Sequence, residues 1–264
     1  MAYHVVIPAR HASTRLPGKP LLDIGGRTMI QRVVEQAVAS GADQVLVATD
    51  DDRIAAAVHD PRRPQVPIAV MTDAALPSGT DRVAAVARLR GWADDTIVVN
   101  VQGDEPFVPP RLIDQVAALL ARDSAAAIAT LATPIDSLHD FLDPNVVKVV
   151  VAADGAALYF SRAPIPWSRD GATAGPGSQA EFAGALRHVG LYAYRVGALR
   201  RITSMPPSSY ELTEKLEQLR ALQSGLRIAV APCVELPGPG IDTETDLQRA
   251  RARTSTLTGA PKDE

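Results

Sequence analysis

The sequence predicts an α/β fold built on a doubly wound, mostly parallel β-sheet, with a smaller mixed, β-rich insertion. In the first half of the chain, short apolar runs of strand length alternate with amphipathic stretches of helix length. The most apolar runs are rich in β-branched residues, which is typical of strands buried on both faces of a parallel sheet. The second half is less regular, and Asp154-Gly155 there indicates a hairpin turn.

Strands and helices are expected in strict alternation through the first half. The expected strands cover residues 3–7, 44–48, 68–71, 96–101 and 128–132. The expected helices cover residues 29–39, 51–58, 80–89 and 110–122, the third capped by Thr80 or Asp81, with a proline-rich loop at 61–67.

The second half predicts a hairpin followed by mixed elements. Its expected strands cover residues 146–151, 156–160, 187–194 and 228–231, its helices 210–224 and 243–254, and its surface loop 171–178. No stretch has the composition of a linker between domains. We therefore expect one domain over residues 1–264, which contains an insertion at about 134–225.

Composition and charge exclude several functional classes. The chain has 264 residues and a net charge of -3, which gives no electrostatic reason to expect nucleic-acid or membrane binding. No apolar run approaches the roughly 20 residues of a transmembrane helix. The single cysteine, Cys233, excludes an intramolecular disulfide, is compatible with a cytoplasmic protein, and is expected to have a packing role.

A basic loop follows the first expected strand. It begins with Pro8 and Ala9, and carries Arg10, Arg15 and Lys19. The carboxyl end of a strand is where open α/β sheets bind ligands, and guanidinium and ammonium groups suit a polyphosphate. The glycine spacing matches neither a P-loop nor a dinucleotide-binding turn.

Two aspartates are candidate magnesium ligands. Gln102, Gly103 and Asp104 follow the strand at 96–101, where Gly103 permits close approach of a base or ribose. Asp104 can hold Mg²⁺ beside substrate phosphates, or simply close a turn. Asp242 precedes the last helix and is either an N-cap, a role open to Thr243 as well, or a second Mg²⁺ ligand.

Further polar groups fit a nucleotide base and an acidic, polyhydroxylated sugar. Ser78 and Gly79 can surround a base, and Arg82 is either an anion-binding group or a solvated side chain beside a helix cap. In the second half of the chain, an arginine side chain can bind the carboxylate of such a sugar, and glutamate and glutamine side chains can form hydrogen bonds with its hydroxyls. Glu214, Glu217 and Gln218 are spaced to share one helix face. For His188 and Glu217, a structural histidine and a solvated helix face are the alternatives.

These segments together resemble the sugar nucleotidylyltransferase family, and within it the cytidylyltransferases that activate 3-deoxy-manno-octulosonate (Kdo). The resemblance reaches to about Arg253 and departs from the family pattern at Asp81, where glutamate is expected, and in the loop at 171–178. The segments that carry it are residues 8–20, 78–82, 101–106, 145–150, 159–167, 187–192 and 216–220.

The resemblance implies that CTP and Kdo give CMP-Kdo and pyrophosphate with Mg²⁺, for lipopolysaccharide biosynthesis, in a cytoplasmic homodimer formed through the insertion. It implies catalytic roles for Arg10, Lys19, Asp104 and Asp242, the last two as metal ligands. The implied nucleotide-binding residues are Pro8, Ala9, Arg10, Arg15, Lys19, Ser78, Gly79, Gln102 and Gly103. The implied Kdo-binding residues are Arg82, Arg162, His188, Tyr192, Glu214, Glu217 and Gln218. The alternatives are an enzyme similar to CMP-sialic acid synthetase and a non-catalytic nucleotide-binding module.

Overall fold

A twisted β-sheet forms the centre of the molecule. The computed structural model describes residues 1–12, 16–59, 68–172, 174 and 176–258. Within these residues nine strands form one sheet, in the order β3-β2-β1-β4-β8-β5-β9, with β6 paired to β8 and β7 paired to β6. The strands are β1 (His4–Ala9), β2 (Gln44–Thr49), β3 (Ile68–Met71), β4 (Ile97–Asn100), β5 (Ile128–Pro134), β6 (Lys148–Val151), β7 (Ala157–Ser161), β8 (Leu186–Arg195) and β9 (Ile228–Pro232).

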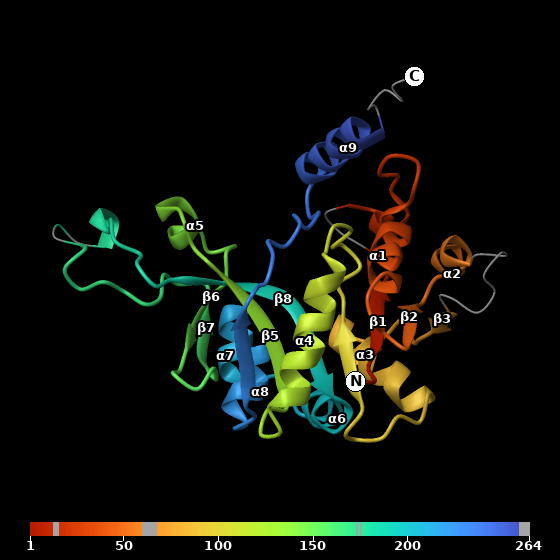
Figure 1. Cartoon of the computed structure of the whole chain (residues 1–264), viewed down its shortest axis with the longest axis horizontal. Helices are drawn as coiled ribbons and strands as arrows, with labels where there is room; N and C mark the ends of the chain where they lie inside the picture. The colour runs from red at the N-terminus through yellow and green to blue at the C-terminus, as the bar shows by residue number, and fades with distance from the viewer. Residues whose placement is uncertain (13–15, 60–67, 173, 175, 259–264) are drawn as a thin grey trace.

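Helices cover both faces of this sheet (Figure 1). One apolar layer joins the sheet to α1, α2 and α4, and the other joins it to α3, α6 and α8. The helices are α1 (Met29–Val38), α2 (Asp52–Val58), α3 (Gly79–Leu89), α4 (Pro110–Arg122), α5 (Leu138–Leu142), α6 (Val196–Ser204), α7 (Ser209–Glu214), α8 (Gln218–Gln223) and α9 (Glu244–Thr258), with short 3₁₀ turns η1 (Lys19–Leu21) and η2 (Pro176–Ser178). None of the helices in the described residues is long and apolar enough to cross a bilayer.

The pairing confirms the predicted doubly wound, mostly parallel sheet. Strands β1, β2, β3 and β4 are mutually parallel, and β5 is parallel to β9. Within the row of strands from β3 to β9, β8 is the antiparallel strand, because it runs antiparallel to both β4 and β5. It belongs to the segment expected as an insertion, yet it joins the two parallel halves of the sheet. The hairpin of β6 and β7 extends from its side, with Gly155 at φ 80° in the turn.

Several expected elements differ from the structure. Helices α5 and α6 were not expected from the sequence pattern. The cap of α3 is Ser78, whose hydroxyl accepts a hydrogen bond from the Asp81 amide, so neither Thr80 nor Asp81 is the cap. The proline-rich loop expected at 61–67 lies outside the described residues, as does part of the loop at 171–178.

The helix expected at 210–224 is two helices, α7 and α8. Lys215 lies between them in the left-handed conformation (φ 55°, ψ 44°), and is the one non-glycine residue with positive φ among those described. The sequence gives no local signal for this break, because the helical pattern of residues 210–224 continues through Lys215. Tertiary contacts outweigh the helical propensity here.

An ion pair joins the two helices across the break. Arg220 on α8 donates from Nε to Oε2 of Glu211 on α7 at 2.7 Å, and its Nη2 donates to Oε1 of the same carboxylate. The two side chains are only 14% and 9% exposed. Burial opposes ionisation of Glu211, but the Arg220 hydrogen bonds outweigh it and hold the pKa of this carboxyl below its ordinary value.

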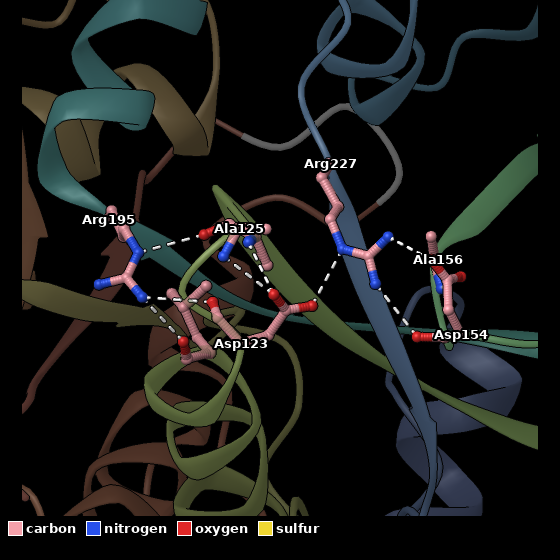
Figure 2. Close-up of polar contacts among 8 residues, drawn as sticks. Asp123, Ala125, Asp154, Ala156, Arg195 and Arg227 are labelled. Atoms are coloured by element: carbon pink, nitrogen blue, oxygen red, sulfur yellow. Dashed lines mark hydrogen bonds and ion pairs between the residues drawn. The ribbon is translucent and has the colours of Figure 1, made fainter.

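The amino-terminal edge of the sheet is held by two arginines on either side of Asp123 (Figure 2). Arg195 donates to the main-chain carbonyl oxygens of Ala126 and Leu120, and Arg227 donates to the carboxylates of Asp123 at 3.0 Å and Asp154 at 2.8 Å. These contacts join β8, β9 and the β6–β7 turn at the edge remote from the carboxyl ends of β1 and β4.

We predict that Glu211→Gln lowers the free energy of unfolding by about 2 kcal/mol at pH 7, because it leaves Arg220 without its charged partner in a mostly buried place. The folded-state pKa of Glu211 is depressed, so the pair stabilises the protein above the ordinary value of 4.5 and loses this effect as pH falls through the folded-state pKa. The difference from wild type in urea unfolding should therefore shrink in acid. Glu35→Gln, which removes an exposed pair with Arg27, is the control and should change little. Equal effects of both substitutions would contradict the prediction.

Candidate functional site

A cavity of about 260 Å³ lies at the carboxyl ends of β1 and β4. The chain proceeds from β1 outward to β2 and β3, then returns to β4 on the other side of β1. This reversal creates the crevice in which open α/β sheets bind ligands. The residues that line it are Pro8, Ala9, Arg10, Ala12, Lys19, Pro20, Gly79, Arg82, Gln102, Gly103, Asp104 and Asp242.

Gly103 brings the β4 loop against the end of β1. A Cβ built on Gly103 would lie 2.7 Å from the carbonyl oxygen of Pro8 and 3.6 Å from the Cβ of Ala9. Because the nearest atom belongs to the backbone of a central strand, it cannot move aside as a flexible side chain would. The lack of a side chain at 103 therefore lets Gln102 and Asp104 lie beside the basic loop.

Lys19 connects the two predicted metal ligands. Its ammonium donates to Oδ2 of Asp104 at 2.7 Å and to Oδ1 of Asp242 at 3.0 Å. The lysine side chain is 12% exposed, whereas the aspartates are 39% and 53% exposed toward the cavity. One cation already contacts both carboxylates, so they lie close enough together to share one.

The main chain holds Asp242 in this place. The amide of Ile241 donates to the carbonyl oxygen of Asp104 at 3.0 Å, and the Ile241 side chain is buried with Leu16 and Met29. Thr243 caps the following helix, since its hydroxyl accepts from the amide of Asp246. The Asp242 carboxylate accepts from Lys19 instead, so Asp242 is not the N-cap.

The cavity has side chains of both charges, since Arg10, Lys19 and Arg82 line it together with Asp104 and Asp242. Burial, together with Asp104 and Asp242, raises the pKa of Glu105 to about 7. Sequence reasoning did not select Glu105, although it directly follows Asp104. In the part of the chain that is described, no three His, Cys, Asp or Glu side chains converge on one point. A divalent ion held by the two aspartates would thus take its other ligands from water and substrate oxygens, as Mg²⁺ commonly does.

Arg82 and Ser78 differ from their expected surroundings. Arg82 is 2% exposed and donates to Oδ2 of Asp50 at 2.6 Å and to the hydroxyl of Thr72 at 2.7 Å. The alternative of a solvated arginine is therefore wrong. Arg82 lines the first cavity and lies apart from the predicted Kdo-binding residues of the second half of the chain. Ser78 is used as the cap of α3, and its neighbour Gly79 reaches the cavity. Arg15 lies outside the described residues.

A second pocket, of about 180 Å³, adjoins the first and shares Gly79 and Gln102 with it. It lies between the amino end of α3, strand β8 and the break between α7 and α8. The Thr80 hydroxyl donates to Oε2 of Glu217 at 2.7 Å and so links α3 to the break. The pocket is lined by Gly79, Thr80, Asn100, Gln102, Tyr192, Tyr194, Lys215, Leu216, Glu217 and Gln218.

The break in the helix separates Glu214 from Glu217 and Gln218. Glu214 accepts from the Ser161 hydroxyl at 2.7 Å and from the amide of Arg162 at 2.9 Å. Its carboxylate therefore stabilises the end of β7 instead of lining the pocket. The expectation that these residues share one helix face is wrong, because the left-handed Lys215 redirects the chain between them.

Arg162 is also held by the fold. Its Nε donates to the carbonyl oxygen of Glu214 at 2.7 Å, and its Nη1 to that of Pro144 at 2.9 Å. The guanidinium thus lies beside the α7 end, and it is Tyr192, Glu217 and Gln218 that the structure brings together in the second pocket.

His188 adjoins the second pocket through Tyr192. Its Nε2 lies 3.0 Å from the Thr130 hydroxyl, and its ring packs against Phe160 and Tyr192 at centroid distances of 5.0 and 5.2 Å. Burial lowers the pKa of His188 to about 3, so the imidazole is neutral near pH 7. It can exchange hydrogen bonds with a ligand but cannot act there as a cation.

Sequence reasoning missed several residues of the second pocket. Tyr194 and Asn100 end apolar runs and look like interior strand residues, and Lys215 looks like a solvated helical residue. A usable signal existed for Asn100, since it is the one polar residue of the β4 segment Ile97–Asn100.

We predict that Gly103→Ala lowers turnover by at least roughly tenfold and destabilises the protein by about 1–3 kcal/mol, because the new methyl group meets the Pro8 carbonyl. Gly177→Ala is the matched control, since no described atom lies within 4 Å of a Cβ there and its φ is not positive. Thermal unfolding and steady-state kinetics test both. Wild-type behaviour of Gly103→Ala would show that the close approach is not required.

Comparisons with known proteins agree with this geometry. The model of the cytidylyltransferase family matches residues 4–228. A 3-deoxy-manno-octulosonate cytidylyltransferase of Xanthomonas euvesicatoria pv. vesicatoria is 57% identical, covering 95% of both chains, and that of Thioalkalivibrio sulfidiphilus is 53% identical, covering 94% of this chain and 97% of the other.

Solved structures extend the likeness to three dimensions. The structure of a CMP:2-keto-3-deoxy-manno-octonic acid synthetase complexed with CTP has a TM-score of 0.84 and 41% identity, covering 97% of this chain and all of the other. A cytidylyltransferase from Leptospira borgpetersenii, at 16% identity and a TM-score of 0.61, shares the fold and covers 97% of this chain and 87% of its own. The chain belongs to the cytidylyltransferase family, among the 3-deoxy-manno-octulosonate cytidylyltransferases.

Proposed function

We propose that this protein transfers the CMP group of CTP to Kdo and releases pyrophosphate. The observation that carries the proposal is the placement of Lys19, Asp104 and Asp242 in one cavity, next to a second pocket with groups suited to a sugar acid. The relatives named above, at 53–57% identity over nearly the whole chain, support the choice of both substrates.

In this proposal the first cavity binds the nucleotide. Pro8 and Ala9 provide the floor at the end of β1, and Arg10, Arg15 and Lys19 bind the triphosphate. The cytosine end lies toward α3 and the β4 loop, near Ser78, Gly79, Gln102 and Gly103. Arg82, which the Asp50 ion pair holds at the wall of this cavity, contacts the part of the acceptor that reaches the nucleotide.

Asp104 and Asp242 would hold Mg²⁺, a fit supported by their hard oxygen donors, their exposure to the cavity and their shared contact with one cation. When bound, Mg²⁺ supplies neutralisation of phosphate charge. Lys19 keeps both carboxylates oriented, and as a residue of the cavity lining it is well placed to contact the phosphate oxygens of a bound triphosphate.

The acceptor lies in the second pocket and extends toward the β7 end. Glu217, Gln218 and Tyr192 exchange hydrogen bonds with its hydroxyls, and neutral His188 supports them from beside Tyr192. Arg162 binds the carboxylate of the acid, while Glu214 positions Arg162 through its hydrogen bonds. The segment at about 134–225 then serves as the acceptor-binding and dimerisation insertion.

Chemistry follows from the adjacency of the two pockets. The anomeric hydroxyl oxygen of Kdo attacks the α-phosphorus of CTP in line, the new oxygen–phosphorus bond forms, and the bond to the pyrophosphate oxygen breaks. The hydroxyl proton leaves to solvent, and pyrophosphate departs with the electron pair. Positioning and the positive charges of Arg10 and Lys19 stabilise this transfer, without a covalent enzyme intermediate.

The biological setting completes the proposal. The protein acts as a cytoplasmic homodimer and supplies activated Kdo for lipopolysaccharide biosynthesis. Nucleic acids and membranes have no part in the reaction.

Measuring the release of pyrophosphate from CTP in the presence of Mg²⁺ tests the proposal directly. Kdo and N-acetylneuraminate are compared as acceptors, with ATP, GTP and UTP as nucleotide controls. We expect release with CTP and Kdo alone. Release with N-acetylneuraminate would instead indicate an enzyme similar to CMP-sialic acid synthetase. CTP binding without release for any acceptor would indicate a non-catalytic nucleotide-binding module.

We predict that Asp104→Asn lowers kcat by at least roughly a hundredfold while the protein stays folded, because the neutral amide binds Mg²⁺ more weakly than the carboxylate does. Activity should recover only in part at high Mg²⁺. Asp52→Asn, which removes an exposed carboxylate of α2, is the control and should leave kcat unchanged. Near-normal turnover of Asp104→Asn at saturating Mg²⁺ would refute the metal assignment.

A further inference from the structure

Among the described residues that line the second pocket, Asn100 is the one with a buried side-chain polar atom, its Oδ1, that has no hydrogen-bond partner. Building on the proposed function, we propose that Asn100 is a specificity-determining residue, whose amide oxygen accepts a hydrogen bond from a hydroxyl of the sugar acid bound in that pocket.

The sheet geometry places Asn100 on the pocket side. Successive side chains of a strand point to opposite faces, so Asn100 faces the same side as Val98. Val98 belongs to the apolar layer that contains α3 and Tyr192. Asn100 is also directly opposite Tyr192 in the register of β4 with β8, and both residues line the second pocket.

The amide oxygen of Asn100 is unpaired. The residue is 1% exposed, and its Oδ1 has no hydrogen-bond partner among the described residues. A buried polar atom without a partner destabilises a fold, and such atoms are uncommon in native proteins. A ligand donor reaching this part of the pocket would supply the missing hydrogen bond.

Two buried polar groups of the same sheet, the side chains of Thr130 and Lys148, are fully paired, in contrast to Asn100. The Thr130 hydroxyl is within hydrogen-bond distance of His188 and of the carbonyl oxygens of Val189 and Leu191. The ammonium of Lys148 donates to three main-chain carbonyl oxygens. The two other unpaired buried atoms found in the described residues belong to His4 and Glu235, which line neither pocket.

The surroundings favour the acceptor over the nucleotide as the donor. Asn100 lines the second pocket and not the cavity that holds Lys19 and Asp104. Its polar neighbours in that pocket include Glu217, Gln218 and Tyr192, groups that pair with hydroxyls. A sugar hydroxyl can donate to Asn100 and accept from such a neighbour at the same time.

The variant Asn100→Leu has a side chain of nearly the same shape but without polar atoms. The sign of its effect on Tm distinguishes a ligand-binding role of Asn100 from a structural role. We expect a higher Tm in the absence of substrates, since the unpaired amide is removed. We also expect KM for Kdo to rise roughly tenfold, with KM for CTP nearly unchanged. A structural role for Asn100 would give a lower Tm instead.

Thr130→Val is the matched stability control, because it removes a buried hydroxyl that is fully paired, and its Tm should fall. A second variant, Asn100→Ser, keeps a short polar group that cannot reach as far, and should also raise KM for Kdo. A lowered Tm of Asn100→Leu, an unchanged KM for Kdo in both variants, or an effect on KM for CTP alone would overturn the proposal.

The failure of this inference differs from failure of the proposed function. Wild-type protein that releases no pyrophosphate from CTP and Kdo contradicts the proposed function. Wild-type activity combined with unchanged KM for Kdo in the Asn100 variants contradicts only the role of Asn100. The Tm comparison needs no substrate, so it reports on the unpaired amide in either case.

Discussion

The ammonium of Lys19 between the carboxylates of Asp104 and Asp242 is the interaction on which the site depends. It joins the loop after β1, the loop after β4 and the segment before α9, which are far apart in the sequence. The hydrogen bond from Ile241 to Asp104 and the burial of Ile241 hold the third segment against the other two. In Figure 1, α9 accordingly lies beside the loop before α1, where Arg251 donates to the carbonyl oxygen of Asp23.

A second constraint arises from the break between α7 and α8. A continuous helix would present Glu214, Glu217 and Gln218 together, as the sequence spacing suggests. The left-handed Lys215 instead sends Glu214 to the end of β7 and leaves Glu217 at the start of α8. The same break therefore serves two purposes, because it positions Arg162 on one side and shapes the second pocket on the other.

The two pockets share Gly79 and Gln102, so a ligand in one lies next to a ligand in the other. This adjacency suits a direct transfer between two bound substrates. One wall is held in place by an ion pair, since Arg82 lines the first cavity and donates to Asp50. Rigid walls reduce the reorganisation needed during transfer.

The sequence by itself determined the alternating fold class, the basic loop and the aspartate after β4, because strand periodicity and the ends of apolar runs are local properties. It also carried the family resemblance that the comparisons confirm. Only the tertiary structure decided that β8 lies between β4 and β5, that Arg82 is buried, and that Lys215 divides a helix. These features depend on partners more than 30 residues away, such as Asp50 for Arg82 and Ser161 for Glu214, which no local pattern encodes.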